Sequence, residues 1–252
     1  MILHWDTQNA CEFDLKDTLC VLNVGSTEQH SDYLPLGTDN FIGESITKQA
    51  AMESGFKVMI MPSQRVGFSA HHRNFAGCIT ISQRVLQEYL FELFYCAVAN
   101  GAQKIMIVNA HGGNQACLQA VVNDLGRELG VKAVLVRYWD LIAEHIKELR
   151  QSQPGGMGHA GELETSLMMF LLPHLVDKSA IGERPAAEGS PWHHPDMFSN
   201  NKIYIYKPFD EYSPKGNVGQ PIFADEEKGE KIFRLAVNEL KSLMQWQMSN
   251  EI

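Results

Sequence analysis

The sequence predicts an α/β fold in which a mostly parallel sheet is covered by helices on both faces. Short apolar runs alternate with longer segments whose apolar residues recur every three or four positions. The composition, 44% hydrophobic and 20% charged over 252 residues, is that of a folded globular protein rather than a disordered or fibrous one. Alternation of this kind is typical of parallel sheets whose crossovers are helices.

Each element follows from a local pattern. Buried strands are expected over residues 19–24, 57–61, 104–108 and 132–137. Helices are expected over 40–53, 82–100 and 114–129, and Gly101 and Gly130 follow the last two as stop signals. A final amphipathic helix over 225–247 closes the domain. Residues 179–221 are rich in Pro, Gly, Ser and Asn, and we interpret them as a long irregular excursion, either a lid or an oligomer contact.

Charge and composition argue against several functions. The formal net charge is −9 and the sequence has no cluster of lysines and arginines, so we expect no nucleic-acid partner. No apolar run approaches the roughly 18 residues that span a bilayer, and no secretory signal is visible. We therefore expect a soluble, cytoplasmic protein without a membrane partner. The 5 cysteines are widely spaced, and we interpret them as reduced packing residues.

Ligand-type residues follow the predicted strands, where the functional loops of a parallel sheet gather. Glu28 and His30 come after the first strand, and in an extended segment residues two apart point the same way. With Asp39 they offer carboxylate and imidazole groups, which suit zinc or manganese. A solvated loop is the alternative interpretation of the same residues.

His111 directly follows the third strand, inside the segment AHGGN. Two glycines there allow a tight turn, and Asn109 and Asn114 are placed to brace it. Taken alone, His111 is equally well explained as a hydrogen-bonded turn residue. Its emergence at the same end of the sheet as Glu28 and His30 favours a shared site.

The segment GHAGELETS, residues 158–166, leads from a glycine-rich loop into an apolar helix. Glu162 and Glu164 stand at the helix start, where a capping role explains at least one of them. His159 has no such structural explanation. Its flexible loop suits a mobile acid or base.

Four segments together resemble the creatininase (creatinine amidohydrolase) family: GSTEQHSDYLPLGTD, VNAHGGN, RYWD and HAGELETS, in that order. The resemblance spans the whole chain. It implies a three-layer α/β/α sandwich, a site for two metals and a homohexamer. Because the candidate residues run from Glu28 to Glu164 and must converge, we expect a single domain over residues 1–252.

The resemblance also assigns roles to individual residues. Glu28 and His111 would bind one metal, His30 and Glu164 the other, and Asp39 would bridge the two. Zinc is the first expectation, with manganese or iron as alternatives, because mixed oxygen and nitrogen ligands select weakly among them. A metal-bridging hydroxide would then hydrolyse a C–N bond of a cyclic amide or formamide, with His159 as proton shuttle.

The family pattern places a substrate pocket beside these metals. Trp139 would form a flat apolar wall against the small-molecule substrate. Ser69 and His71, from the segment that also contains His72, are expected in the same wall, and Glu162 is assigned to the pocket as well. Ordinary core packing is the alternative for Trp139.

The sequence departs from creatininase itself at several positions. Gly112 and Gly113 follow the turn histidine where creatininase has an aromatic residue and a further metal-site glutamate, and the flap reads QPGGMG without its tryptophan. Ser31 and Tyr33 replace a usual glycine and histidine. The pocket should be more open, which makes creatinine a doubtful substrate. Two alternatives follow: a C–C bond hydrolase acting on a cyclic polyol ketone, and a catalytically silent scaffold.

Overall fold

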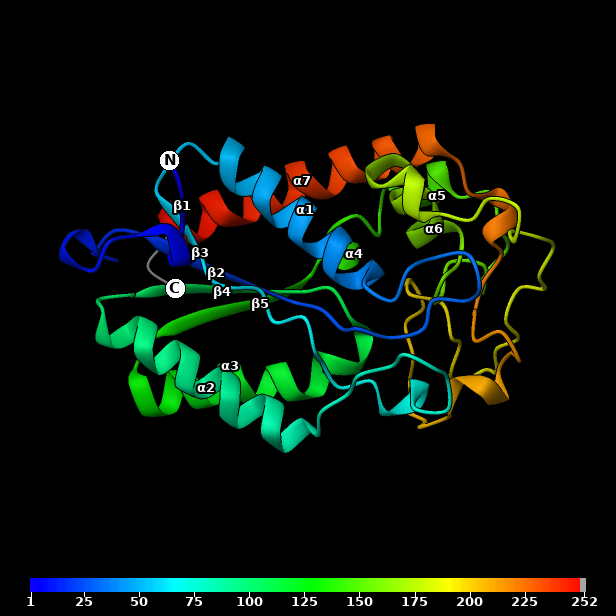
Figure 1. The fold of residues 1–252 in the computed structure, drawn as a ribbon, viewed down its shortest axis with the longest axis horizontal. Coiled ribbons are helices and arrows are strands. Elements are labelled where there is room, and N and C mark those ends of the chain that lie inside the picture. Colours follow the sequence, from blue (N-terminus) through cyan, green and yellow to red (C-terminus); the bar gives the residue numbers. More distant parts are fainter. Residues whose placement is uncertain (250–252) are drawn as a thin grey trace.

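The fold is a parallel sheet between two layers of helices (Figure 1). The computed structural model describes residues 1–249, and within them the sheet has 5 strands in the order β1-β3-β2-β4-β5. Each neighbouring pair is parallel, and β2 pairs with both β3 and β4. The strands are β1 (Ile2–His4), β2 (Leu19–Val24), β3 (Val58–Ile60), β4 (Lys104–Asn109) and β5 (Lys132–Arg137).

Helices connect the strands and cover both faces of the sheet (Figure 1). The α-helices are α1 (Thr38–Glu53), α2 (Gln83–Ala99), α3 (Gln115–Leu129), α4 (Tyr138–Leu141), α5 (Ile146–Leu149), α6 (Glu162–Leu171) and α7 (Glu226–Ser249). Short 3-10 turns cover Trp5–Thr7, Ala10–Glu12, Ala70–His72, Gly112–Asn114, Pro173–Leu175, Phe209–Glu211 and Pro221–Phe223.

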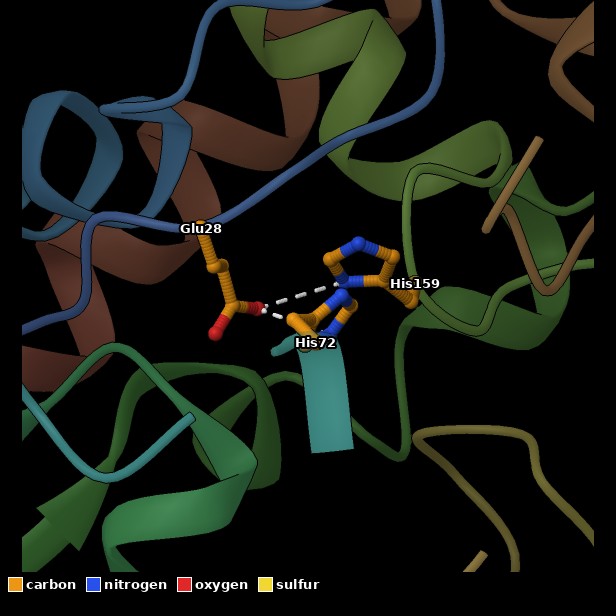
Figure 2. A group of neighbouring side chains, drawn as sticks. All are labelled: Glu28, His72 and His159. Carbon is orange, nitrogen blue, oxygen red and sulfur yellow. Dashed lines mark ion pairs between the residues drawn. The ribbon is translucent and has the colours of Figure 1, made fainter. Parts of the chain in front are cut away.

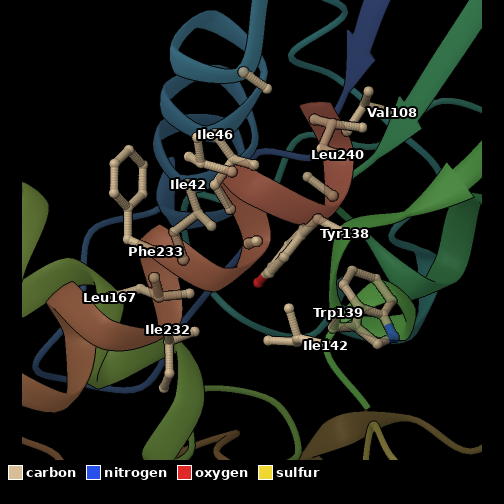
Figure 3. Close-up of a cluster of buried hydrophobic side chains, with 14 of the residues drawn as sticks. Ile42, Ile46, Val108, Tyr138, Trp139, Ile142, Leu167, Ile232, Phe233 and Leu240 are labelled. Atoms are coloured by element: carbon tan, nitrogen blue, oxygen red, sulfur yellow. The ribbon is translucent and has the colours of Figure 1, made fainter. Parts of the chain in front are cut away.

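Two hydrophobic cores lie on opposite faces of the sheet, because successive side chains of a strand point to opposite sides. Val21 packs into the core beneath α1, α6 and α7, and its neighbour Leu22 packs into the core beneath α2 and α3. Figure 3 shows the first core, where Ile42 of α1 and Ile232 of α7 lie near Tyr138. The predicted three-layer α/β/α class is therefore confirmed.

The long predicted elements match closely, whereas the short helices α4 and α5 were not predicted. Strands over 19–24 and 132–137 have the expected bounds, and the helix after residue 82 is capped by Ser82, whose hydroxyl accepts from Val85 N at 3.3 Å. Gly130 ends α3 in the left-handed conformation, with φ of 66°. The short edge strand β1 was not predicted from the sequence. Residues 250–252 of the predicted domain lie outside the described residues.

The excursion over residues 179–221 contains no α-helix and no strand, as its Pro- and Gly-rich composition indicates; it has 3-10 turns and an isolated bridge from Gly219 to Met157. No helix of the described part of the chain is long and apolar enough to cross a membrane. All the cysteines are free; Cys20 and Cys117 are buried packing residues, whereas Cys11 and Cys96 are exposed. The expected packing role therefore holds for Cys20 and Cys117 but not for Cys11 and Cys96.

Candidate active site

Six ligand-type side chains converge at the carboxyl edge of the sheet. They come from the loop after β2, the first turn of α1, the turn after β4, and the loop and first turn of α6. All are buried, although the segments lie far apart in sequence: Glu28, His30, Asp39, His111, His159 and Glu164. The loops that follow parallel strands meet at this edge, which is why the site forms there.

Asp39 stands at the centre of the group. Its Oδ1 lies 3.0 Å from His30 Nε2, and its Oδ2 lies 3.2 Å from His111 Nδ1. Glu28 Oε1 is 3.3 Å from the same nitrogen of His111, and Glu164 Oε2 is 3.9 Å from that of His30. Asp39 therefore lies between two halves of the cluster: Glu28 with His111 on one side, and His30 with Glu164 on the other.

Backbone carbonyls orient both histidines. His30 Nδ1 lies 3.1 Å from the carbonyl oxygen of Glu28, and His111 Nε2 lies 3.1 Å from that of Phe68. Because a carbonyl only accepts, the neutral form of each ring keeps its proton there and turns its lone pair toward the carboxylates. This is the usual preparation of a metal-ligating histidine.

The electrostatics of the site match this donor set. Burial alone lowers the pKa of His30, but Asp39 and Glu164 outweigh it and raise the pKa to about 9. Burial likewise opposes protonation of His111, yet Glu28 and Asp39 hold its pKa well above the usual range. Glu28 Oε1 and Asp39 Oδ2 are buried without a hydrogen-bond partner. Buried carboxylate oxygens that face an imidazole nitrogen without a hydrogen bond fit a divalent cation, because buried anionic oxygens need compensation.

Ser69, expected in the pocket wall, instead forms a hydrogen bond with Glu28. The side chain is fully buried, and its hydroxyl donates to Glu28 Oε2. Its backbone N–H donates to Thr80 Oγ1 at 2.8 Å, which fixes the segment. Ser69 is thus placed to orient a ligand carboxylate rather than to touch a substrate.

Glu162, also expected in the pocket, does not reach it. The carboxylate accepts from the backbone N–H groups of Gln151 and Ser152, both at 2.9 Å, and from Lys228 Nζ. On an α-helix, residues two apart do not share a face, so Glu164 points into the site while Glu162 points away. We correct the pocket assignment accordingly: Glu162 anchors the 150–152 segment and α7.

A cavity of about 280 Å³ opens above the cluster. Trp139 and His71 line it, and the His71 ring stacks on that of His111 with centroids 5.4 Å apart. Trp139 is only 3% exposed and also packs in the first hydrophobic core. Part of the excursion completes the wall, with contributions from His193, His194, Tyr204, Tyr206, Lys207 and Phe209.

Glycines shape the floor of this cavity. A Cβ at Gly113 would meet His111 Nε2 and the Phe68 carbonyl oxygen at 2.4 Å each, whereas one at Gly112 would meet nothing within 4 Å. A glutamate at position 113 therefore requires the turn to move. The close approach of the backbone here explains why a further carboxylate is missing.

Two further departures from the family pattern have local consequences. Ser31 adopts a φ of 63°, the left-handed region that favours the glycine usual at this position. Tyr33 is buried and its hydroxyl donates to the Ala160 carbonyl, next to His159. Tyr33 thus ties the first motif to the loop that carries His159.

His72 was not selected from the sequence, and the structure places it inside the cluster (Figure 2). The ring is fully buried, with Nε2 3.3 Å from Glu28 Oε1 and its centroid 4.3 Å from that of His159. His72 ends the 3-10 turn Ala70–His72, and three residues make one such turn. The three-residue spacing between Ser69 and His72 was the sequence signal that could have identified His72, because one 3-10 turn brings both side chains to Glu28.

Comparison with known proteins agrees with this architecture. The chain matches the family "Creatininase: Creatinine amidohydrolase" over residues 3–244. It is 28% identical over 235 residues to a mycofactocin precursor peptide peptidase of Mycobacterium ulcerans (strain Agy99), covering 88% of this chain and 82% of that one. It is 25% identical over 237 residues to a creatinine amidohydrolase of Pseudomonas putida, covering 88% and 86%.

Solved structures share the fold. A mutant creatininase described as "Zn-Zn type" superimposes with a TM-score of 0.84 at 22% identity, covering 99% of this chain and 100% of that one. Fold and site together define a three-layer α/β/α hydrolase with a buried carboxylate–imidazole cluster. The chain belongs to the creatininase family.

Proposed function

We propose that this protein is a dinuclear-metal amidohydrolase that cleaves a C–N amide bond. The observation that carries the proposal is Asp39, whose two carboxylate oxygens each face a different histidine. Glu28, Asp39 and His111 would hold one cation, and His30, Asp39 and Glu164 the other. When bound, such a pair supplies an activated water and stabilises negative charge on the substrate carbonyl oxygen.

Zinc is the first candidate and manganese the second, because mixed imidazole and carboxylate ligands accept both. A Zn-Zn form and a form described as "Creatininase Mn" exist among the similar structures. Iron satisfies the same donor set. Three carboxylates, from Glu28, Asp39 and Glu164, offset most of the charge of two divalent cations.

His159 is placed to move the proton. Its Nε2 lies 2.6 Å from the Gln29 carbonyl oxygen, so the neutral ring keeps its hydrogen there and turns the Nδ1 lone pair toward Glu28. Burial, together with neighbouring His30 and His72, holds the pKa of His159 well below its usual range. A neutral imidazole accepts a proton at Nδ1 and returns it to the leaving nitrogen, which must be protonated as the amide bond breaks.

The cavity wall indicates a planar substrate. Trp139 presents an apolar surface beside the cluster, and Arg137 lies 5.6 Å from its ring centroid. Gly112, where a Cβ would meet nothing within 4 Å, leaves the floor open, so creatinine is not the best-fitting substrate. We infer another amide: a cyclic amide, a formamide, or a peptide, the last being the substrate class named for the Mycobacterium ulcerans relative.

A substrate panel tests the proposed reaction. The zinc- or manganese-loaded protein is assayed on creatinine, other cyclic amides, N-formyl compounds and short peptides, beside cyclic polyol ketones. Formation of a carboxylate together with a freed nitrogen group supports the proposal; both stay on one ring-opened molecule for a cyclic amide, whereas an N-formyl compound or a peptide gives two products. A relative 22% identical, from Thermotoga maritima, is named 3-dehydro-scyllo-inosose hydrolase, so turnover of ketones alone would support C–C cleavage instead.

The ligands should release protons when the cations bind. In the metal-free chain His30, with its pKa raised to about 9, carries a proton at pH 7, whereas a metal ligand must be neutral. Metal affinity is therefore expected to rise with pH from 6 to about 9. Calorimetry in buffers of different ionisation enthalpy measures the released protons, and an affinity independent of pH over this range would contradict the assignment.

Ser69→Ala tests whether the Ser69 hydroxyl orients Glu28 for metal binding. Loss of the hydroxyl that donates to Glu28 Oε2 should weaken cation binding about 10–100-fold, the usual effect of an outer-shell partner. Isothermal titration of the stripped protein with Zn²⁺ measures it. Ser82→Ala, a change of the same type at a helix cap, should leave the affinity unchanged, and equal affinities for all three proteins would show that Ser69 does not orient Glu28.

We also propose that the protein is a homo-oligomer, with the hexamer that the family resemblance implies. Light scattering coupled to size-exclusion chromatography measures the assembly directly. A monomer that is fully active would argue that the excursion over residues 179–221 serves the cavity alone.

A further inference from the structure

Three side chains converge on a point beside the proposed metal pair. Glu28 Oε1 lies 3.3 Å from His72 Nε2 and 3.5 Å from His159 Nδ1 (Figure 2). All three residues are buried, and all three line the cavity. They come from separate segments: the loop after β2, the 3-10 turn Ala70–His72 and the loop before α6.

No hydrogen bond joins Glu28 Oε1 to His72. His159 keeps its hydrogen on Nε2, toward the Gln29 carbonyl, so Nδ1 faces Glu28 as a lone pair. Neither ring nitrogen of His72 has a hydrogen-bond partner, and Glu28 Oε1 has none. A buried carboxylate oxygen that faces an imidazole lone pair, as Glu28 Oε1 faces His159 Nδ1, is repelled unless a positive charge lies between the two atoms.

His159 is oriented in the same way as His30 and His111. In all three, one ring nitrogen lies against a backbone carbonyl and the other faces a carboxylate. A carbonyl that holds the hydrogen of one ring nitrogen leaves the other nitrogen free to bind a metal. The proposed proton shuttle therefore also has the orientation of a ligand.

We propose that Glu28, His72 and His159 form a further divalent-cation site, of the zinc type, separate from the proposed pair. Two imidazoles and one carboxylate are a familiar zinc ligand set that leaves one position open. Tetrahedral zinc with bonds of about 2.0–2.1 Å keeps its ligand atoms about 3.3 Å apart, close to the two separations that the structure gives.

This site should bind a cation more weakly than the pair does, and a cation bound there should inhibit the enzyme. It shares Glu28 with the first cation of the pair, so a further cation meets repulsion from its neighbours. A cation there takes the lone pair of His159 Nδ1, the atom that the proposed function uses to move the proton. The inhibitory consequence rests on that proposed function, whereas the binding itself does not.

Zinc titration of the chelator-stripped protein tests the site. The native chain should bind a tight pair of Zn²⁺ ions and then one weaker equivalent, measured by equilibrium dialysis with elemental analysis. His72→Asn and His159→Asn, changes on two different segments, should each retain the tight pair and lose the weaker equivalent. His193→Asn, a cavity histidine outside the group, should retain all of them. Circular dichroism confirms that each variant is folded.

Each outcome distinguishes the inference from the proposed function. A native chain that binds the tight pair alone, or variants that keep the weaker equivalent, would overturn the further site while leaving the pair intact. A native chain without the tight pair would overturn the proposed function, and a remaining equivalent lost in His72→Asn would still support the further site. With an amide identified by the panel, excess Zn²⁺ should inhibit the native enzyme. Persistent inhibition of His72→Asn would overturn the inhibitory role.

Discussion

Asp39→Ala is expected to abolish binding of both cations and all hydrolytic activity. Each carboxylate oxygen faces a different histidine, so the substitution removes a ligand from both halves at once. It also leaves His30 and His111 without the carboxylate between them. Metal affinity should fall by more than about 10–100-fold, which is the usual effect of removing a residue that only hydrogen-bonds a metal ligand. Elemental analysis after dialysis, and assay on the amide that the panel identifies, measure both effects.

Asp124→Ala provides the control for this result. Asp124 lies on α3, where its carboxylate accepts from Gln87 and pairs with Arg127, away from the cluster. This variant should keep its metal and its activity. An Asp39→Ala protein that retained both would show that the carboxylate does not bridge the two halves.

His159→Gln is expected to lower kcat by about 10²–10⁴, the usual contribution of a general acid or base, while the tight metal pair remains bound. The glutamine amide stays polar but is too weakly basic to accept and return a proton. KM should change less than kcat, because the residue acts on the proton rather than on binding. Steady-state kinetics with parallel metal analysis separate the two.

His145→Gln is the matched control, because His145 is half-exposed and its nearest charged partner is Glu239. Its kinetics should equal those of the native chain. If His159→Gln lost the tight metal pair as well, His159 would be a ligand of that pair and not its proton shuttle.

The fold was predictable because long apolar patterns determine it. The run at 19–24 gave the right bounds because a fully buried parallel strand reads as a continuous apolar segment. The run at 132–137 gave the right bounds from its apolar centre, although β5 is an edge strand and is mostly half-buried rather than buried as predicted. β1 was missed because Ile2–His4 is too short to carry a period, and only its pairing with β3 makes it a strand. Tertiary context, rather than local pattern, decides such an edge.

The site was predictable in its members and less so in their directions. Glu162 and Glu164 look equivalent in sequence, yet the helical period turns Glu162 to Lys228 and Glu164 to His30. His71 and His72 are adjacent, and only the course of the 3-10 turn places His72 against Glu28. Where a side chain points depends on local backbone geometry, which residue identity alone does not give.

Anomalous X-ray scattering from crystals loaded with zinc or manganese tests the central claim most directly. We expect two strong peaks at stoichiometric metal, one among Glu28, Asp39 and His111 and the other among His30, Asp39 and Glu164. Both peaks should vanish in Asp39→Ala crystals. The absence of any peak at these residues in the native chain at saturating metal would contradict a dinuclear-metal hydrolase.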